Sequence, residues 1–344
     1  MPRVLVVKTS SLGDVIHTLP ALTDAAAAIP GIRFDWVVEE AFSEVPGWHP
    51  AVDRVISVAV RRWRKHPWQA WRSGQWQDFK RRIGTHSYDA VIDAQGLLKS
   101  AWLTRYARGV RYGLDKQSAR EPMASRFYQH PLHVAKGQHA VERTRQLFAA
   151  ALGYELGEGK GRYNLSFDGQ RQPVVVLLHG TTWASKHWPE DSWQALARLL
   201  TDAGLRPQLP WGNDEERQRA ERIAAASGAE VLPRLSLTQL AKLLASATGC
   251  VSVDTGLGHL AAAVSTPTVA LFGPTNAALT GFYGENQHFL QSGYHCSPCM
   301  ERRCRYDLPP GAYPPCFDEL SAQRVFDELM ALLESSGRAQ GGQQ

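Results

Sequence analysis

Short runs rich in Val, Ile and Leu alternate along the chain with longer amphipathic stretches, and this alternation constrains the fold more than any other feature. In the first half, the predicted strands are residues 3–7, 34–38, 54–60 and 89–94. In the second half, they are residues 173–180, 206–212, 229–233, 249–256 and 266–273. Strands that alternate with helices are typical of parallel sheets with helices on both faces. The sequence therefore predicts an α/β fold with two Rossmann-like halves.

The organisation of the chain follows from its length and from one polar segment. Its 344 residues exceed the roughly 250–300 residues beyond which a single core usually divides into domains. The predicted parts are an N-terminal domain at residues 1–160, a linker at 161–172, a C-terminal domain at 173–320, a helix at 321–335 and a disordered tail at 336–344. In the second domain, a Ser-x-x-Gln capping box predicts a helix from Ser236 to about Ala247.

Charge and cysteine content narrow the class of protein. The formal net charge is +5, and the chain has five cysteines. The apolar run before Lys8 is too short for a signal peptide, and the longest uncharged run, 255–284, is interrupted by Gly, Pro and Thr residues. We therefore expect a soluble cytoplasmic protein without a disulfide framework.

A polar loop follows the strand predicted at residues 173–180. It contains Thr181 and Thr182, and Lys186 lies just before a helix that we expect to begin near Pro189. Hydroxyl groups, backbone N–H groups and a lysine at the carboxyl end of a strand suit an anion such as a pyrophosphate. The alternative is a polar loop with a solvated lysine.

A second loop of this kind ends the strand predicted at residues 249–256. Asp254, Thr255 and Gly256 lie where the strand passes into a helix, and His259 lies one turn inside that helix. The free N–H groups of this turn and the Thr255 hydroxyl suit a second phosphate contact. A helix cap without a ligand is the alternative. Two such loops in one half favour a nucleotide-sugar site.

The first loop of the chain, VKTSSLGDVIHTLP at residues 7–20, has neither of the two glycine-rich phosphate-binding fingerprints. Instead, a carboxylate, Asp14, lies where a helix is predicted to begin. The missing fingerprint counts against a nicotinamide-dependent oxidoreductase, which remains an alternative class of enzyme.

Residues 60–82 form a basic, tryptophan-rich stretch. They include eight Lys or Arg residues and four tryptophans, but only one acidic residue, Asp78. Such a stretch can bind phosphate groups, lie at a membrane interface or stack on sugars. A nucleic-acid-binding module and a solvated basic helix are the alternatives.

Four cysteines near the end of the chain form a C-x2-C-x4-C-x11-C array. They are Cys296, Cys299, Cys304 and Cys316. The first pair has the spacing of zinc ligands, and four thiolates can close a structural site. The alternatives are reduced thiols or a pair oxidised on handling. The fifth cysteine, Cys250, is expected to be a small buried side chain in a strand.

Several segments together resemble glycosyltransferase family 9, the heptosyltransferases of lipopolysaccharide synthesis. They are VKTSSLGDVIHTLPALTDA, FDWVVEE, RRWRK, YDAVIDAQGLLKSA, SAREP, QHAVERTR, TTWASKHWPE, LPWG and SVDTGLGHL, which stand in the family's order from residue 3 to about residue 285. The resemblance implies a GT-B fold, in which two Rossmann-like domains face each other across a cleft. It also implies ADP-heptose as the donor and 3-deoxy-octulosonate (Kdo) on lipid A as the acceptor. The Thr-Ser-Ser form of the first loop favours the enzyme that adds the first heptose; addition of a later heptose and a different donor sugar are the alternatives.

The resemblance also assigns roles at the reacting centre. Asp14 would be the general base of an inverting transfer, and we expect the adjacent helix N-terminus to lower the pKa of its carboxyl. Lys186, Thr181 and Thr182 would hold the pyrophosphate and stabilise the departing charge without a catalytic metal. The other implied donor-site residues are Ser11 and Gly13 beside the base, Glu215 at the ribose with Glu216 as the alternative, Leu235 at the adenine with a core position as the alternative, Asp254 at the sugar, and Thr255, Gly256 and His259 at the phosphates.

The acceptor and the partners follow from the same resemblance. The implied acceptor-binding residues are Arg61, Arg62, Arg64, Lys65 and Arg120. We expect a monomer that associates peripherally with the cytoplasmic face of the inner membrane, binds no nucleic acid and needs no cofactor. Some family members lack the four clustered cysteines, so the transfer reaction does not need them; a structural zinc there is possible but not expected.

Overall fold

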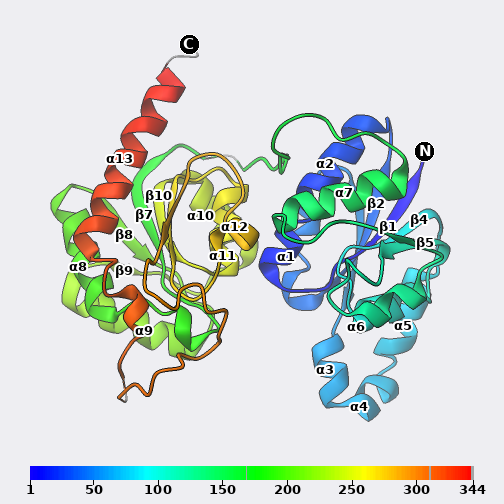
Figure 1. The fold of residues 1–344 in the computed structure, drawn as a ribbon, viewed down its shortest axis with the longest axis horizontal. Coiled ribbons are helices and arrows are strands. Elements are labelled where there is room, and N and C mark those ends of the chain that lie inside the picture. Colours follow the sequence, from blue (N-terminus) through cyan, green and yellow to red (C-terminus); the bar gives the residue numbers. More distant parts are fainter. Residues whose placement is uncertain (168, 310, 342–344) are drawn as a thin grey trace. The chain divides into compact units, whose positions relative to one another are not determined.

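The computed structural model describes residues 1–167, 169–309 and 311–341, and the chain divides into two compact units (Figure 1). The first unit is Met1–Leu165, and the second begins at Ser166. The boundary between them lies inside the segment predicted as a linker, residues 161–172. Each unit is a parallel sheet with helices on both faces, as the alternation of strands and helices predicts.

The first unit has a six-stranded parallel sheet in the order β3-β2-β1-β4-β5-β6. Its strands are β1 (Arg3–Val7), β2 (Arg33–Glu39), β3 (Val52–Val58), β4 (Ser87–Asp93), β5 (Arg108–Leu114) and β6 (His130–Leu132). Its helices are α1 (Leu12–Ile16), α2 (Leu19–Ala28), α3 (Val60–Lys65), α4 (Pro67–Arg72), α5 (Gln75–Ile83), α6 (Leu98–Thr104) and α7 (Ala140–Leu152), with short 3-10 turns at η1 (Glu40–Phe42), η2 (Pro46–Trp48) and η3 (Pro122–Phe127).

The core of the first unit lies on both faces of its sheet. On one face, Leu5 and Val7 of β1 pack with Phe79 of α5 and Leu103 of α6. On the other face, α2 and α7 pack against each other, and Phe34 of β2 contacts Phe148 of α7. Alternate residues of the strands therefore enter opposite halves of the core.

The second unit has a six-stranded parallel sheet in the order β12-β11-β10-β7-β8-β9. Its strands are β7 (Gln172–Leu178), β8 (Arg206–Leu209), β9 (Glu230–Val231), β10 (Ala247–Val253), β11 (Thr268–Phe272) and β12 (Gln287–Gln291). Its helices are α8 (Glu190–Asp202), α9 (Asp214–Ser227), α10 (Leu237–Ser246), α11 (Gly256–Ala263), α12 (Ala277–Thr280) and α13 (Ala322–Gly341), with 3-10 turns at η4 (Ala184–Lys186) and η5 (Pro315–Phe317).

The two faces of the second sheet are covered by different helices. Trp193 and Leu200 of α8, Ile223 of α9 and Leu329 of α13 share one core cluster with alternate strand residues such as Val251. The opposite face packs against α10 and α11. Ser236 caps α10 by accepting from the Gln239 N–H at 3.2 Å, which confirms the predicted start of that helix.

The structure corrects several predicted boundaries. The strand predicted at 54–60 ends at Val58, and Val60 begins α3. The basic stretch at residues 60–82 consists of three short helices, α3, α4 and most of α5. The last helix continues to Gly341, so the disordered tail predicted at residues 336–344 is wrong for 336–341; residues 342–344 lie outside the described part of the chain. Strands β5, β6 and β12 were not predicted.

No helix within the described residues is both long and apolar enough to cross a membrane.

The strand orders identify where ligands bind. In each sheet the order reverses once, between β1 and β4 in the first unit and between β7 and β10 in the second. Ligands of open parallel sheets bind at the carboxyl ends of the strands beside such a switch point. The loops that follow β1, β4, β7 and β10 are therefore the expected ligand-binding loops.

Candidate active site

An ion pair joins the two loops at the switch point of the second sheet. Lys186, in the loop after β7, places its Nζ 2.7 Å from Oδ2 of Asp254, which follows β10. Thr275, after β11, donates its hydroxyl to the same oxygen at 2.7 Å. The Lys186 ammonium also lies 4.3 Å from the centre of the Trp183 ring. Three loops from neighbouring strands thus converge on one carboxylate. We call residues 179–187 the Lys186 loop.

The predicted threonines and helix N-terminus lie at the same place. Thr181 donates its hydroxyl to the carbonyl of Asp254 at 3.4 Å, and Thr182 is exposed. Thr255 is the N-cap of α11, but its side chain makes no capping hydrogen bond. The first N–H groups of α11 therefore lie beside Lys186 and Thr181, in the arrangement that favours an anion.

His259 is buried one turn into α11. Its ring packs edge-on against Phe282, with the ring centres 5.0 Å apart. A Cβ added at Gly258 would lie only 2.0 Å from the Phe282 ring, so this helix needs a glycine there to approach the ring. The Gly-His pair therefore fixes the packing of α11, and His259 is buried behind the first turn of that helix.

The structure separates the two ribose candidates. Glu216 is half-buried, accepts a hydrogen bond from the Gly212 N–H at 2.8 Å, and faces the backbone of Gly180 so closely that a Cβ there would lie 2.9 Å from its Oε1. Glu215 is exposed. Asn213 caps α9, and this sets the phase of the helix so that Glu216 turns toward the Lys186 loop. Glu216 is therefore the better-placed candidate.

Leu235, the predicted adenine neighbour, lies half-buried in the loop between β9 and α10. It is not part of the core cluster that packs α8, α9 and α13 against the sheet. This leaves its side chain at the carboxyl end of the sheet, near the edge formed by β8 and β9.

Asp14 lies at the switch point of the first sheet. It is in the first turn of α1, which begins two residues earlier at Leu12 rather than near Asp14 as predicted. Its Oδ2 accepts from the Ser11 N–H at 2.7 Å and from the Ser11 hydroxyl at 2.9 Å. Gly13 is buried beside it. The loop thus holds the Asp14 carboxylate in one orientation, half-exposed after β1.

Two lysines that the sequence did not single out lie close to Asp14. Lys8 is buried and donates to the Ala94 carbonyl at 2.8 Å. Burial lowers the pKa of Lys8, and the Asp14 charge opposes that shift. Lys99, at the start of α6, donates to the Ser10 hydroxyl at 2.9 Å. Burial also lowers the pKa of Lys99. In the sequence, the only sign of a role for either lysine is its position near the end of a strand.

A buried carboxylate organises the loop that carries Lys99. Asp93 accepts from the Tyr128 hydroxyl at 2.7 Å, the Ser100 hydroxyl at 2.9 Å and the Gln95 N–H at 2.8 Å, and burial raises the pKa of Asp93. The Gln95 side chain then accepts from the N–H and the hydroxyl of Thr9, each at 2.8 Å. The loops after β1 and β4 are thereby bonded to each other.

Part of the predicted acceptor cluster reaches this site. The N–H of Arg61 donates to Glu39 at 3.1 Å, and burial raises the pKa of Glu39. Burial is the main cause of the lowered pKa of Lys99, and the nearby positive charges of Arg61 and Arg64 lower it further. The structure therefore places Arg61 and Arg64 on the Lys99 side of Asp14.

The other predicted basic residues lie further apart. Arg62 donates to Glu40 at 3.1 Å in an exposed ion pair, and Lys65 is exposed at the end of α3. Arg120 is exposed on a different loop, and its charge contributes to the lowered pKa of Lys8, which is mainly due to burial. Arg61 and Arg64 thus lie near Lys99, and Arg120 lies near Lys8, so the five basic residues do not form one cluster.

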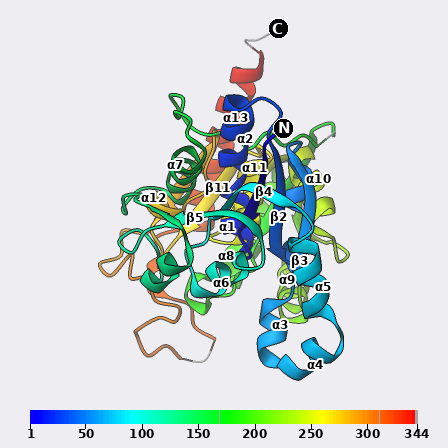
Figure 2. The ribbon, with the colours of Figure 1, turned by 90° about the vertical axis from the view of Figure 1, so that its right-hand side faces the viewer.

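The four tryptophans of the basic stretch divide into two pairs. Trp63 and Trp76 pack onto the core of the first unit beside Phe79. Trp68 and Trp71, on α4, are 77% and 59% exposed. Figures 1 and 2 show α3 and α4 extending beyond the sheet of the first unit. The tip of this extension therefore presents two indole rings among basic side chains.

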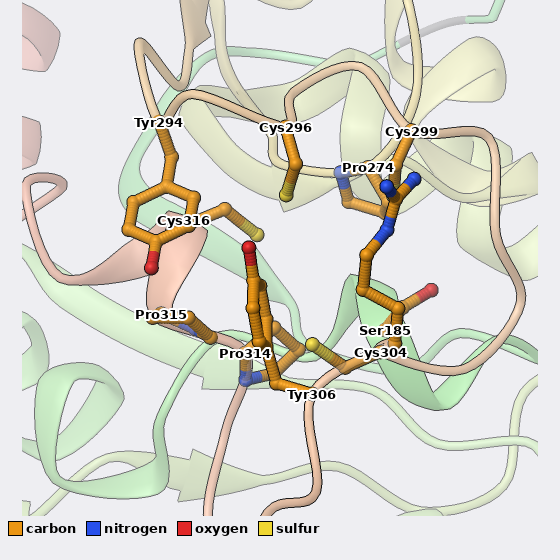
Figure 3. A pocket seen from close by; sticks show the side chains of 11 residues that line it. Ser185, Pro274, Tyr294, Cys296, Cys299, Cys304, Tyr306, Pro314, Pro315 and Cys316 are labelled. Carbon is orange, nitrogen blue, oxygen red and sulfur yellow. The ribbon is translucent and has the colours of Figure 1, made fainter.

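The clustered cysteines lie around one small pocket of the second unit (Figure 3). We call Cys296, Cys299, Cys304 and Cys316 the four-cysteine cluster. All are free thiols. Burial, together with the other three thiols, raises the pKa of Cys316 to about 12. Cys250 is fully buried in β10, as predicted.

Known proteins are similar to this chain in sequence. The family model of glycosyltransferase family 9 (heptosyltransferase) matches residues 76–308. A lipopolysaccharide heptosyltransferase 1 from Pseudomonas aeruginosa is 58% identical over 348 residues, covering 96% of this chain and 98% of the relative. One from Escherichia coli K12 is 54% identical over 295 residues, covering 83% of this chain and 92% of the relative.

A solved structure agrees with these relatives. The E. coli heptosyltransferase WaaC with ADP superposes with a TM-score of 0.85 at 48% identity, covering 96% of this chain and 99% of that chain. The prediction of two Rossmann-like domains of the GT-B class is confirmed, and the alternative of a nicotinamide-dependent oxidoreductase is wrong. The chain belongs to glycosyltransferase family 9, and it is a heptosyltransferase of lipopolysaccharide synthesis.

Proposed function

We propose that the chain transfers L-glycero-D-manno-heptose from ADP-heptose to Kdo of Kdo-lipid A, with inversion at the anomeric carbon. The proposal that ADP-heptose is the donor rests on one observation: Lys186, Asp254 and the N-terminus of α11 converge at one switch point. A family member, E. coli WaaC, has been solved with ADP and with ADP-2-deoxy-2-fluoro heptose. The donor proposal extends that chemistry to this chain.

On the donor side, the leaving group is ADP, whose charge grows as the bond between the anomeric carbon and the phosphate oxygen breaks. Lys186 and the hydroxyls of Thr181 and Thr182 stabilise that charge, together with the first N–H groups of α11. Asp254 holds the Lys186 ammonium before the donor arrives, and then accepts hydrogen bonds from the sugar. Glu216 accepts hydrogen bonds from the ribose hydroxyls.

On the acceptor side, Asp14 takes the proton of the attacking Kdo hydroxyl while the new bond to the anomeric carbon forms. Ser11 keeps the Asp14 carboxylate oriented through its two hydrogen bonds. Arg61, Arg64 and Arg120 bind the acceptor's carboxylates and phosphates, and Lys99 adds a charge between Asp14 and the pair Arg61 and Arg64. Arg62 and Lys65 extend the basic surface outward.

The exposed tip of the first unit suggests how a lipid acceptor is reached. Trp68 and Trp71 lie among Arg and Lys side chains on α3 and α4. Indole rings prefer the membrane–water interface, and basic side chains favour anionic lipid. We propose that this tip holds the enzyme, as a monomer, at the cytoplasmic face of the inner membrane.

The experiment that tests the reaction is product analysis by mass spectrometry. Purified enzyme with ADP-heptose and delipidated Kdo-lipid A should give an acceptor heavier by one heptose. An acceptor that already carries the first heptose should not react. Reaction of that second acceptor alone would instead assign the enzyme to a later heptose, and no product with either would refute the proposed acceptor.

A further inference from the structure

The segment between β12 and α13 holds four of the chain's five cysteines but has little regular structure. In its described residues, 292–309 and 311–321, η5 is the only helix and no strand is present. Segments without secondary structure that exceed ~12–15 residues are uncommon in compact domains unless they serve a function. The length and irregularity of this segment are therefore those of a segment with a function.

The four-cysteine cluster surrounds a single small cavity. Its volume of about 10 Å³ is close to the space that one water-sized particle occupies. Figure 3 shows the sulfur atoms of Cys296, Cys304 and Cys316 directed toward the same space, and Cys299 also lines the cavity. None of the four is in a disulfide. The cavity thus has the side-chain composition of a metal site.

The ligands and their spacing identify the class of metal. Cys296 and Cys299 have the two-residue separation of paired ligands in structural zinc sites. Four sulfur ligands select tetrahedral zinc or iron over magnesium or calcium, which prefer oxygen. Arg305 lines the same cavity and brings a positive charge next to the thiolates. We propose that the four-cysteine cluster binds one divalent zinc or iron ion through four thiolates.

Binding requires the thiols to move together. As the side chains stand, no group of three or more His, Cys, Asp or Glu residues in the described parts of the chain is placed to hold a metal ion. Zinc–sulfur distances are about 2.3 Å, so the thiols must turn further into the cavity. Cys296, Cys299 and Cys304 lie outside every helix and strand, so this movement breaks no regular hydrogen bonds. Each thiol that binds releases its proton to solvent.

The cluster is bonded to the loop that carries the catalytic lysine. Ser185, in the Lys186 loop, donates its hydroxyl to the Glu301 carbonyl at 2.6 Å and its N–H to the Arg302 carbonyl at 3.3 Å. These two carbonyls lie between Cys299 and Cys304 in the sequence. An ion that holds both cysteines therefore fixes the backbone on which the Lys186 loop rests, which gives the site a structural role in the second unit.

Elemental analysis of the purified full-length enzyme tests the proposal directly. Purification without a metal-affinity step should yield about one zinc or iron per chain, and the analysis itself shows which. The Cys296→Ser/Cys299→Ser variant should fall to near zero, whereas Cys250→Ala, which removes the one cysteine outside the cluster, should keep its metal. Cobalt in place of the native ion should give the absorption of tetrahedral cobalt thiolate.

A second measurement covers variants that fold poorly. Alkylation of the wild-type enzyme, followed by mass spectrometry, should leave the four clustered cysteines unmodified until a chelator is added. A chelator should also lower the Tm of the wild type but not that of the double serine variant. Wild-type protein with no metal and four readily alkylated thiols would overturn the proposal. Metal bound equally by the double serine variant would be adventitious and would overturn it too.

Discussion

Nζ of Lys186 lies 2.7 Å from Oδ2 of Asp254, although the two residues belong to loops that follow different strands. The Thr275 hydroxyl donates to the same Asp254 oxygen. The pair is largely buried, with 13% of the Lys186 side chain and 8% of the Asp254 side chain exposed. The carboxylate therefore fixes the position of the Lys186 ammonium. In this way the position of the proposed leaving-group stabiliser depends on a residue from another strand.

This pairing makes the effects of the two residues non-additive. Lys186→Met should lower kcat for heptose transfer by ~10²–10³-fold, the usual effect of removing one stabiliser of developing negative charge. Asp254→Asn should also lower kcat, because the ammonium loses its anchor. The double variant should then be little worse than Lys186→Met. Steady-state ADP release measures all three, and fully additive losses would show that the two residues act independently.

The two neighbouring glutamates provide a matched pair for the ribose contact. Glu216→Ala should weaken ADP binding by about tenfold or more, because a hydrogen bond to a charged group contributes about 1.5–3 kcal/mol. Glu215→Ala should bind ADP like the wild type, since its side chain is exposed. Calorimetric titration with ADP measures both. Equal affinities in the two variants would remove Glu216 from the donor site.

The exposed indoles predict how the enzyme binds lipid surfaces. The Trp68→Ser/Trp71→Ser variant should bind anionic phospholipid vesicles about tenfold more weakly or worse, because burial of apolar area contributes roughly 25 cal/mol per Å². Met123→Ser, which replaces an exposed apolar side chain of the first unit outside α3 and α4, should bind like the wild type. Sedimentation with vesicles measures the partition. If the double variant still sedimented fully, the membrane surface would lie elsewhere.

His49 predicts a loss of stability in mild acid. Its Nδ1 accepts from the Ala51 N–H at 3.2 Å, and its Nε2 lies 3.0 Å from the Thr23 hydroxyl. Burial, with a smaller effect of Arg33, lowers the pKa of His49 from 6.5 to about 4. Between these values the unfolded chain binds a proton that the folded chain does not. The free energy of unfolding should therefore fall as pH decreases through this window.

The size of this effect has an upper bound and a control. A shift of this size corresponds to about 3 kcal/mol at most, because one pKa unit is 1.36 kcal/mol. Chemical denaturation at neutral pH and near pH 4.5 measures it, with His49→Gln as the comparison. The variant should lose less stability between the two conditions. His179 and His187, whose pKa burial also lowers to about 4, should contribute in the same direction in the second unit.

Local signals predicted the central strands and the loops that follow them. The run at residues 3–7 is apolar throughout its last four residues and was found as β1. Strands β6 and β12 were not predicted because their sequences, His-Pro-Leu and Gln-His-Phe-Leu-Gln, have no continuous apolar run. Both strands lie at sheet edges. Edge strands are half solvated, so their sequences need not be hydrophobic.

The site was predictable in its residue types but not in its pairings. A lysine after one strand and an Asp-Thr-Gly turn after another were visible, yet only the sheet order brings Lys186 to Asp254. Lys8 and Lys99 were not predicted as site residues, because a single lysine near the end of a strand is not a recognisable motif. The choice between Glu215 and Glu216 depended on the phase of one helix, which the cap at Asn213 sets.

The measurement that tests the central claim most directly is acceptor-dependent ADP release by the wild type and by Asp14→Ala. Kdo-lipid A should stimulate ADP release from ADP-heptose in the wild type and in the control Asp202→Ala, which changes an exposed aspartate of α8 in the second unit. Asp14→Ala should lose that stimulation by ~10²-fold or more, the contribution expected of a general base, while binding ADP normally. An Asp14→Ala enzyme that transfers heptose at the wild-type rate would contradict the account.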